Sequence, residues 1–74
     1  MHTTVIVQDR CGSARENKRV QLMLLHGSFT EEVYTNTEGR AVIFHDKDGM
    51  AKVYIAGNGC VGEYRIPDTI IVTI

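Results

Sequence analysis

Short runs of alternating apolar and polar residues, separated by glycine-containing turns, constrain this chain more than any other feature. The clearest case is the stretch from Thr35 to Gly59, where three runs are divided by Glu38-Gly39 and by Lys47-Asp48-Gly49. Asp-Gly between apolar runs is a strong hairpin signal, because glycine accepts the positive φ that tight turns need. We therefore predict two hairpins here, which together make a β-meander.

The rest of the chain continues the same period-two pattern, and no useful stretch has a helical period. Strands are predicted over Thr3–Gln8, Val20–Leu25, Phe29–Thr35, Ala41–His45, Ala51–Ala56, Val61–Ile66 and Thr69–Ile74. About six to seven short strands with regular turns indicate an all-β fold, a small antiparallel β-sandwich with Greek-key or meander connections. The 74 residues are expected to form a single β-sandwich domain, 1–74.

Size and charge argue against several classes of protein. A domain of this length buries only about 60% of the surface of its unfolded chain, and small scaffolds often depend on a disulfide, a metal or a partner. The net charge of −1 argues against a dedicated nucleic-acid or anionic-membrane surface. The longest apolar run, Met23-Leu24-Leu25, is too short to span a bilayer, and no signal-peptide pattern is visible. We therefore expect a cytoplasmic protein if the N-terminus is native.

Two of the predicted strands carry apolar residues on both faces. Met23 and Leu25 lie on the second face of one strand, and Val42 and Phe44 on the second face of another. A strand that is apolar on both faces is usually covered, and so short a chain has little material to cover it. We identify Met23, Leu25, Val42 and Phe44 as a candidate interface for another copy of the chain or for another protein. On length alone, a loop that covers Met23 and Leu25 is an equally good interpretation.

Several runs occur in a familiar order: VIVQD, a polar loop, VQLML, YTNTEGRAVI and AKVYIAG. From Val5 to Ala56, this layout resembles carboxypeptidase regulatory-like and transthyretin-like β-sandwich domains and the related bacterial immunoglobulin-like repeats. The matching positions are Asp9, Gly12, Val20, Leu22, Thr35, Gly39, Arg40, Ala41 and Ile43. The resemblance implies a seven-strand Greek-key sandwich that usually lacks catalysis and serves as a spacer, adhesion unit or regulatory attachment.

The chain departs from the pattern of these families in two places. The loop Asp9–Arg19 lacks the proline that such modules commonly have there. Hydrolases among the transthyretin-like proteins end in Tyr-Arg-Gly-Ser, whereas here Tyr64-Arg65 is followed by Ile66-Pro67. This mismatch argues against a hydrolase, and we expect no catalytic residue in this chain.

Histidines and cysteines suggest an alternative function. His2, His26 and His45 with Cys11 or Cys60 include the residue types of a zinc site, but not the short paired spacing of known sites. We therefore expect no metal site and no cofactor, and we expect both cysteines to be free thiols. A small metal- or thiol-dependent enzyme or binder that uses His26, His45 and Cys60 stays open as the alternative.

The loop Asp9–Arg19 is the most basic segment and suggests a second alternative. It carries Arg10, Arg15, Lys18 and Arg19 against Asp9 and Glu16. A solvated connection explains these charges, and no interleaved aromatic residue offers a surface for base stacking. A weak nucleic-acid contact through this loop is the less favoured interpretation.

Overall fold

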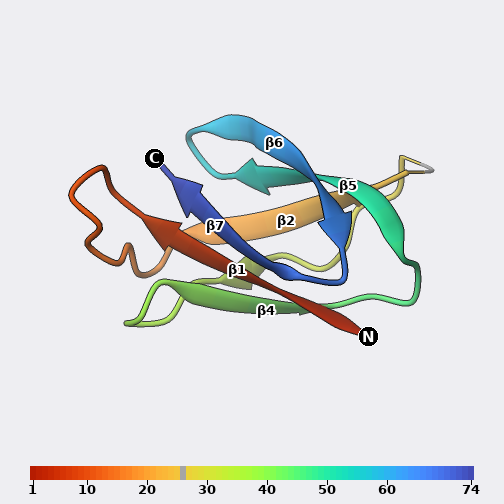
Figure 1. The fold of residues 1–74 in the computed structure, drawn as a ribbon, viewed down its shortest axis with the longest axis horizontal. Coiled ribbons are helices and arrows are strands. Elements are labelled where there is room, and N and C mark those ends of the chain that lie inside the picture. Colours follow the sequence, from red (N-terminus) through yellow and green to blue (C-terminus); the bar gives the residue numbers. More distant parts are fainter. Residues whose placement is uncertain (26) are drawn as a thin grey trace.

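The computed structural model describes residues 1–25 and 27–74, and His26, a candidate residue of the alternative metal- or thiol-dependent site, lies outside the described part. Seven strands, in chain order, are β1 (His2–Gln8), β2 (Arg19–Leu24), β3 (Val33–Tyr34), β4 (Arg40–Phe44), β5 (Gly49–Ile55), β6 (Gly59–Ile66) and β7 (Thr69–Thr73) (Figure 1). No part of the described chain forms a helix long and apolar enough to cross a membrane.

The strands form two sheets, which confirms the predicted all-β fold. One sheet has three strands in the order β4-β1-β7, and the other has four in the order β3-β2-β5-β6. The first is called the three-stranded sheet below and the second the four-stranded sheet. All pairs are antiparallel except β1 and β7, which run parallel. The expected sandwich was antiparallel throughout, so the parallel pair is a difference. It arises because the chain crosses from one sheet to the other at Pro67-Asp68, and β7 then runs beside β1 in the same direction.

The predicted meander is wrong. β4 pairs with β1, so it belongs to a different sheet from both β3 and β5. The turn before β4 does form locally, because Asn36 N donates to Arg40 O and Gly39 N donates to Asn36 O, each at 2.9 Å. The turn residues therefore reverse the chain as predicted, but the strands on either side separate and find partners in opposite sheets.

Consecutive strands pair with each other only between β2 and β3 and between β5 and β6. The second pair is a hairpin, and it closes with Asn58 N donating to Ile55 O at 2.9 Å. All other connections cross between the sheets, which is compatible with the Greek-key alternative and not with a meander.

The strand predicted over Phe29–Thr35 is much shorter than expected. Only β3 pairs along its length, while Phe29 forms an isolated bridge with Met23. Between them, Thr30 bonds to β2 through its side chain as well as its backbone: Thr30 Oγ1 accepts from Leu22 N at 3.0 Å, and Thr30 N donates to Leu22 O at 2.9 Å. The side-chain bond replaces a regular backbone hydrogen bond between the strands, so the predicted strand is interrupted at Thr30.

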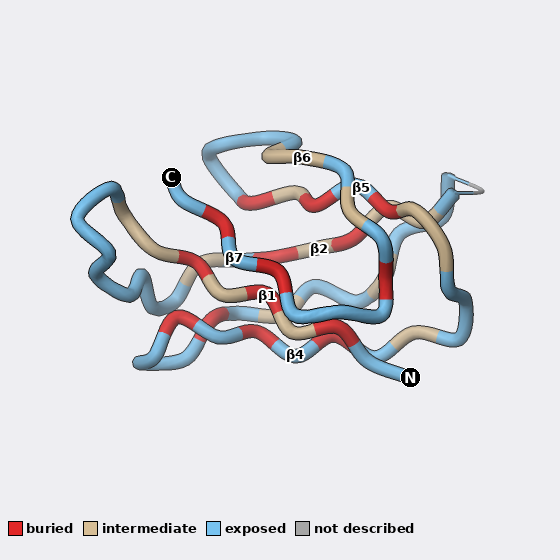
Figure 2. The backbone as a smooth tube through the Cα atoms, viewed as in Figure 1, coloured by how far each residue is buried: buried red, intermediate tan, exposed pale blue. Residues whose placement is uncertain are grey.

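One core lies between the two sheets, and buried and exposed residues alternate along the strands (Figure 2). The buried apolar residues are Val5, Val7, Val20, Leu22, Ala41, Ile43, Ala51, Val53, Ile55, Ile66, Ile70 and Val72. Burying a valine, leucine or isoleucine completely contributes about 1.5–3 kcal/mol each, so this cluster dominates the stability of the fold.

The chain is as compact as an ordinary monomer of its mass. Its accessible surface is 4549 Å², and the scaling law for folded monomers gives about 4,600 Å² for 8.3 kDa. The inner faces of both sheets are therefore covered within one chain. Apolar surface that a partner could still cover lies on the outer faces of the sheets and at their edges.

Candidate functional site

The predicted interface residues lie on two separate surfaces. Met23 is half-buried on β2 in the four-stranded sheet, and Leu25 is 74% exposed in the turn just after this strand. Val42 and Phe44 lie on β4 in the three-stranded sheet, where they are 41% and 73% exposed. Because the sheets face each other across the core, their outer faces point in opposite directions. One flat partner cannot contact all four together, so the candidate interface divides into two surfaces, and its role in association stays a prediction.

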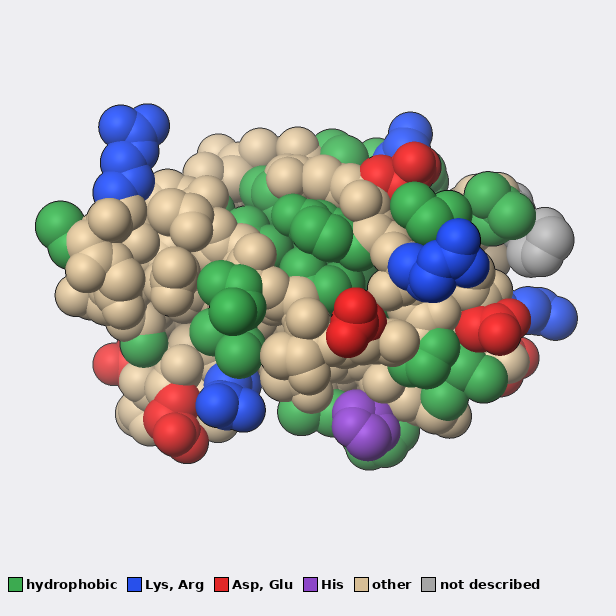
Figure 3. Space-filling view, in the orientation of Figure 1, with side chains coloured by type: hydrophobic (Ala, Val, Ile, Leu, Met, Phe, Trp, Pro, Cys, Tyr) green, Lys and Arg blue, Asp and Glu red, His purple; other side chains and the backbone are tan. Residues whose placement is uncertain are grey.

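The outer face of the three-stranded sheet carries a band of apolar side chains. Inward residues of β1, β4 and β7 alternate with outward ones, so Phe44, Val42, Ile6 and Ile71 point outward. The strand registers place Val42 beside Thr4, and Ile6 beside Ile71. We call these four residues the outer apolar band. Hydrophobic side chains are also visible in the middle of the face shown in Figure 3.

Ile71 belongs to this band although sequence reasoning did not select it. It is 59% exposed and lies between the buried residues Ile70 and Val72. The signal was present in the sequence, because the run Thr69–Ile74 places an apolar residue on its second face at this position. Ile71 is available to a partner because β7 lies at the edge of a sheet, and the alternation of residues in the sequence does not predict that position.

The outer face of the four-stranded sheet is more mixed. Phe29 packs edge-on against Tyr54 with ring centroids 5.7 Å apart, and Lys52 lies opposite Met23. Arg19 Nε lies 2.9 Å from Glu32 Oε2, with both side chains about half exposed. Charged groups therefore interrupt the apolar residues on this face.

Two shallow hollows occur in the described part of the four-stranded sheet. One of about 220 Å³ is lined by residues that include Arg19, Gln21 and Tyr54. The other, of about 270 Å³, is lined by residues that include Met23 and Glu63. Typical small-molecule sites enclose about 300–1,000 Å³ and are largely apolar. Neither hollow reaches that size, so neither indicates a substrate pocket.

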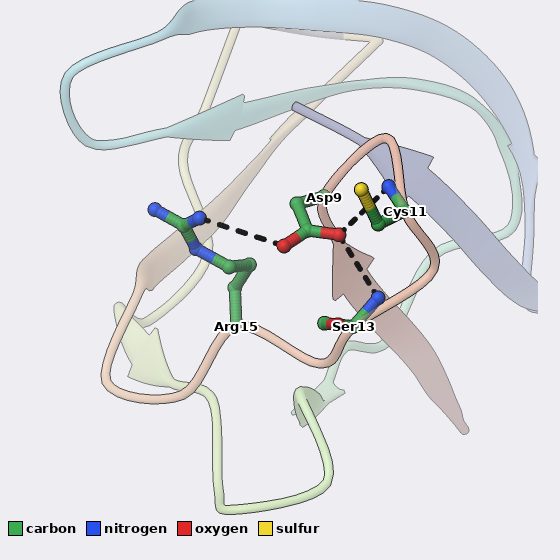
Figure 4. A network of polar contacts seen from close by, with 4 residues as sticks. All are labelled: Asp9, Cys11, Ser13 and Arg15. Atoms are coloured by element: carbon green, nitrogen blue, oxygen red, sulfur yellow. Dashed lines mark hydrogen bonds and ion pairs between the residues drawn. The ribbon is translucent and has the colours of Figure 1, made fainter.

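The basic loop is organised around Asp9 (Figure 4). Asp9 Oδ1 accepts hydrogen bonds from the backbone N–H groups of Cys11 and Ser13, both at 2.9 Å. Its other oxygen lies 3.9 Å from Arg15 Nη1, a weak ion pair at the surface. Two of the four basic side chains of this segment, Arg15 and Arg19, thus have acidic neighbours. This balance of charge fits a solvated connection better than a phosphate-binding surface.

Thr35 ties this loop to the body of the protein. Its hydroxyl accepts from Lys18 N at 2.9 Å and donates to Arg15 O at 2.7 Å, and its side chain is buried. Its backbone accepts from Asn17 N and donates to Lys18 O. The polar loop is therefore held at both ends, by Asp9 near its start and by Thr35 near its end.

The histidine of the alternative site has a structural role. His45 Nδ1 lies 2.8 Å from Lys47 O, which can only accept, so this nitrogen carries the proton. His45 Nε2 then accepts from the hydroxyl of the fully buried Thr3, also at 2.8 Å. Nε2 therefore joins β1 to the connection between β4 and β5, and Nδ1 holds the ring within that connection.

The remaining members of that alternative site do not converge in the described residues. Cys11 and Cys60 are exposed free thiols, and the Cys60 sulfur lies 3.8 Å from Gly62 O. Elsewhere in residues 1–25 and 27–74, no group of three or more His, Cys, Asp or Glu side chains could hold a metal ion. His26 lies outside this part of the chain.

A scan against protein-family models found no matching family, and searches of curated proteins and of solved structures found no similar protein. The resemblance to transthyretin-like and carboxypeptidase regulatory-like domains therefore stays a prediction that rests on the residues themselves.

Proposed function

We propose that this chain is a non-catalytic structural or interaction module that associates with another copy of itself or attaches to a larger protein assembly. The observation that carries the proposal is the outer apolar band, where Phe44 and Ile71 are 73% and 59% exposed on one sheet. Exposed apolar side chains gathered on one face typically mark a site of protein contact, although here His2, Thr4 and Arg40 lie beside Phe44, Val42 and Ile6. The described polar clusters, by contrast, already have structural roles in holding loops and strands.

The association is expected to be weak. Fully burying one large apolar side chain contributes about 1.5–3 kcal/mol, whereas association costs at least about 4 kcal/mol in lost translational and rotational freedom. The four residues of the outer apolar band can exceed that cost only modestly. We therefore expect self-association in the micromolar to millimolar range, not a permanent dimer.

Sedimentation and light scattering over this concentration range test the proposal. If the partner covers the outer face of the sheet, Val42→Lys with Phe44→Lys should weaken association, because both changes put charge on the outer apolar band. The matched control is Met23→Lys with Leu25→Lys, which puts the same charges on the opposite sheet. Stronger loss in the control would move the interface to the four-stranded sheet, and a strictly monomeric wild type would remove the claim of self-association.

We also propose that the fold is transthyretin-like, or more broadly immunoglobulin-like, as the resemblance implies. Its support comes from the roles of the matching residues: Asp9 caps the loop, Thr35 anchors it, and Gly39 sits against the backbone of β1. A family pattern is expected to retain residues that the backbone needs at such places. An experimental structure with a different strand order would contradict this assignment.

Chemical analysis of the purified protein separates the proposal from the metal- or thiol-dependent alternative. Bound zinc in stoichiometric amount, or a thiol that reacts at a pH well below that of ordinary cysteines, would favour an enzyme or binder built on His26, His45 and Cys60. Salt-dependent binding of oligonucleotides would favour the loop Asp9–Arg19 instead. Our proposal predicts none of these results.

A further inference from the structure

We propose that the open edge of β7 pairs with β7 of a second copy, antiparallel and with Ile71 opposite the partner's Ile71. Two three-stranded sheets would then form one continuous six-stranded sheet. The inference rests on the proposed function, since it names both the partner and the strand through which the module associates. Three observations support it: the backbone groups of β7 that face the open edge, the protections found at the other sheet edges, and the self-complementary sequence of the strand.

The backbone polarity of β7 shows which groups face the open edge. Asp68 O accepts from Thr4 N at 3.0 Å, and Ile74 N donates to Gln8 O at 2.9 Å, so these residues point toward β1. Because backbone groups alternate along a strand, Thr69, Ile71 and Thr73 point the other way. Thr69 N bonds to the side chain of Asp68 at 2.8 Å. Within the described residues, the N–H and C=O groups of Ile71 and Thr73 have no backbone partner.

The other sheet edges carry features that discourage pairing with another chain. β6 has the charged residues Glu63 and Arg65, and its pairing with β5 shifts register opposite Val53 and Tyr54. β3 is only two residues long, and β4 begins with Arg40 and contacts β3. β7 contains no charge, no proline and no register shift. Charges, bulges and short length are the usual protections of an edge strand, and β7 has the fewest of them.

The sequence of β7 is complementary to itself. The strand reads Thr-Ile-Ile-Val-Thr. When two copies pair antiparallel with Ile71 opposite Ile71, each threonine therefore faces a threonine and each aliphatic residue faces an aliphatic residue. Thr69 then faces the partner's Thr73, and Ile70 faces the partner's Val72. Cross-strand pairs of β-branched residues and of threonines stabilise sheets, and no like charges meet in this register.

The same register satisfies the backbone. In an antiparallel pair, residues that point at each other exchange both of their hydrogen bonds. Centring on Ile71 brings all three edge-facing residues of β7 into such pairs, provided that Thr69 N exchanges its bond to Asp68 for one to the partner. A shift by one residue would place edge-facing groups opposite groups that point toward β1, and a shift by two would leave one edge-facing residue of each copy unpaired. Backbone geometry and side-chain pattern therefore select one two-fold arrangement.

The resulting dimer would extend the outer apolar band across two copies. Ile71 of each copy would meet at the two-fold axis, with Ile6 beside it on each side. An interface limited to one short strand buries less than about 1,200 Å², which is the range of transient complexes. The dimer is therefore expected to depend on concentration. Val42 and Phe44 lie on β4, at the opposite edge of the three-stranded sheet, so Val42→Lys with Phe44→Lys should leave the β7 dimer intact.

Charge exchange at Ile71 tests the register directly. Ile71→Lys and Ile71→Glu should each weaken dimerisation at least about tenfold, because like charges would then face each other at the axis. An equimolar mixture of the two variants should recover dimers, because each lysine would face a glutamate. Both variants should retain the circular dichroism of the wild type, because the side chain at this position is 59% exposed.

Amide hydrogen exchange supplies a second measurement that needs no variant. The N–H groups of Ile71 and Thr73 should exchange rapidly in dilute samples and slowly in concentrated ones, while those of Ile70 and Val72 stay protected in both. Exchange at Ile71 that does not change with concentration, in a sample shown to contain dimers, would overturn the edge-pairing proposal.

The outcomes separate this inference from the proposed function. If the wild type associates but both Ile71 variants associate equally well and their mixture gains nothing, the edge pairing is wrong and association uses another surface. If Val42→Lys with Phe44→Lys abolishes association while the Ile71 variants do not, the outer face alone is the interface. A wild type that stays monomeric at all concentrations would refute both self-association and the β7 dimer.

Discussion

Gly39 occupies a position where a single added carbon would disturb two strands. Its φ is +75°, and a Cβ placed on it would lie 2.5 Å from the carbonyl oxygen of Val7. That oxygen is backbone of β1 and cannot rotate away, and it also accepts a hydrogen bond from Arg15 N. We expect Gly39→Ala to lower the free energy of unfolding by about 3 kcal/mol, as measured by denaturant titration.

Gly57→Ala is the matched control. Gly57 also has a positive φ, +87°, but a Cβ there would meet nothing within 4 Å. Its substitution should cost only the backbone term, about 1 kcal/mol. Equal losses in the two variants would mean that the close approach to Val7 does not matter.

His45 and Thr3 form a part-buried polar pair whose partners depend on each other. His45→Ala would leave the fully buried hydroxyl of Thr3 without its partner, which should cost about 1–3 kcal/mol. Thr3→Val with His45→Ala removes both partners together. The double variant should therefore lose less stability than the sum of the single variants, as a double-mutant cycle of unfolding free energies would measure. Strict additivity would show that the 2.8 Å contact contributes nothing.

At the scale of elements, the loop that joins β1 to β2 depends on one carboxylate. Asp9→Ala removes the acceptor for the N–H groups of Cys11 and Ser13. Both amides should then exchange with solvent faster, because their local hydrogen bonds are lost. Asp9→Asn keeps an acceptor oxygen and should retain most of the protection, so it separates hydrogen bonding from charge. The pairing of β1 with β7 should be unchanged in both variants.

At the scale of the whole molecule, both sheets share one core and should unfold together. Leu22→Ala opens a cavity at a residue with no exposed surface and should cost about 2–5 kcal/mol. Circular dichroism and tyrosine fluorescence should give the same unfolding midpoint in the wild type and in this variant, because no part of the core is independent. Leu25→Ala changes the same residue type at a site that is 74% exposed, and it should shift the midpoint little. Separate midpoints would indicate that the sheets unfold independently.

The period-two pattern was enough to predict the class of fold and much of its interior. The strands predicted over Thr3–Gln8, Val20–Leu25 and Thr69–Ile74 match β1, β2 and β7 to within one residue at each end, and their alternate apolar residues are buried. The turn at Glu38-Gly39 was also predicted at the right place. These features are local, because side-chain direction alternates along any strand and because glycine tolerates turn geometry wherever it occurs.

Part of the candidate surface could be predicted in the same way. Val42 and Phe44 were selected because their strand is apolar on both faces, and both lie exposed on β4. Met23 and Leu25 were selected by the same rule but lie in and just after a strand of the opposite sheet. The rule identifies residues that do not face the core, but it does not identify which outward residues share a surface.

The sequence alone determined which residues turn inward and where the chain reverses, because both depend on near neighbours. Only the tertiary structure decided which strands pair, why β4 leaves β3 and β5, and why β7 runs parallel to β1 with an open edge. Those choices depend on burying one core between two sheets, which joins residues far apart in the chain. The exposure of Ile71 at that edge follows from this arrangement, and so does its availability to a second copy.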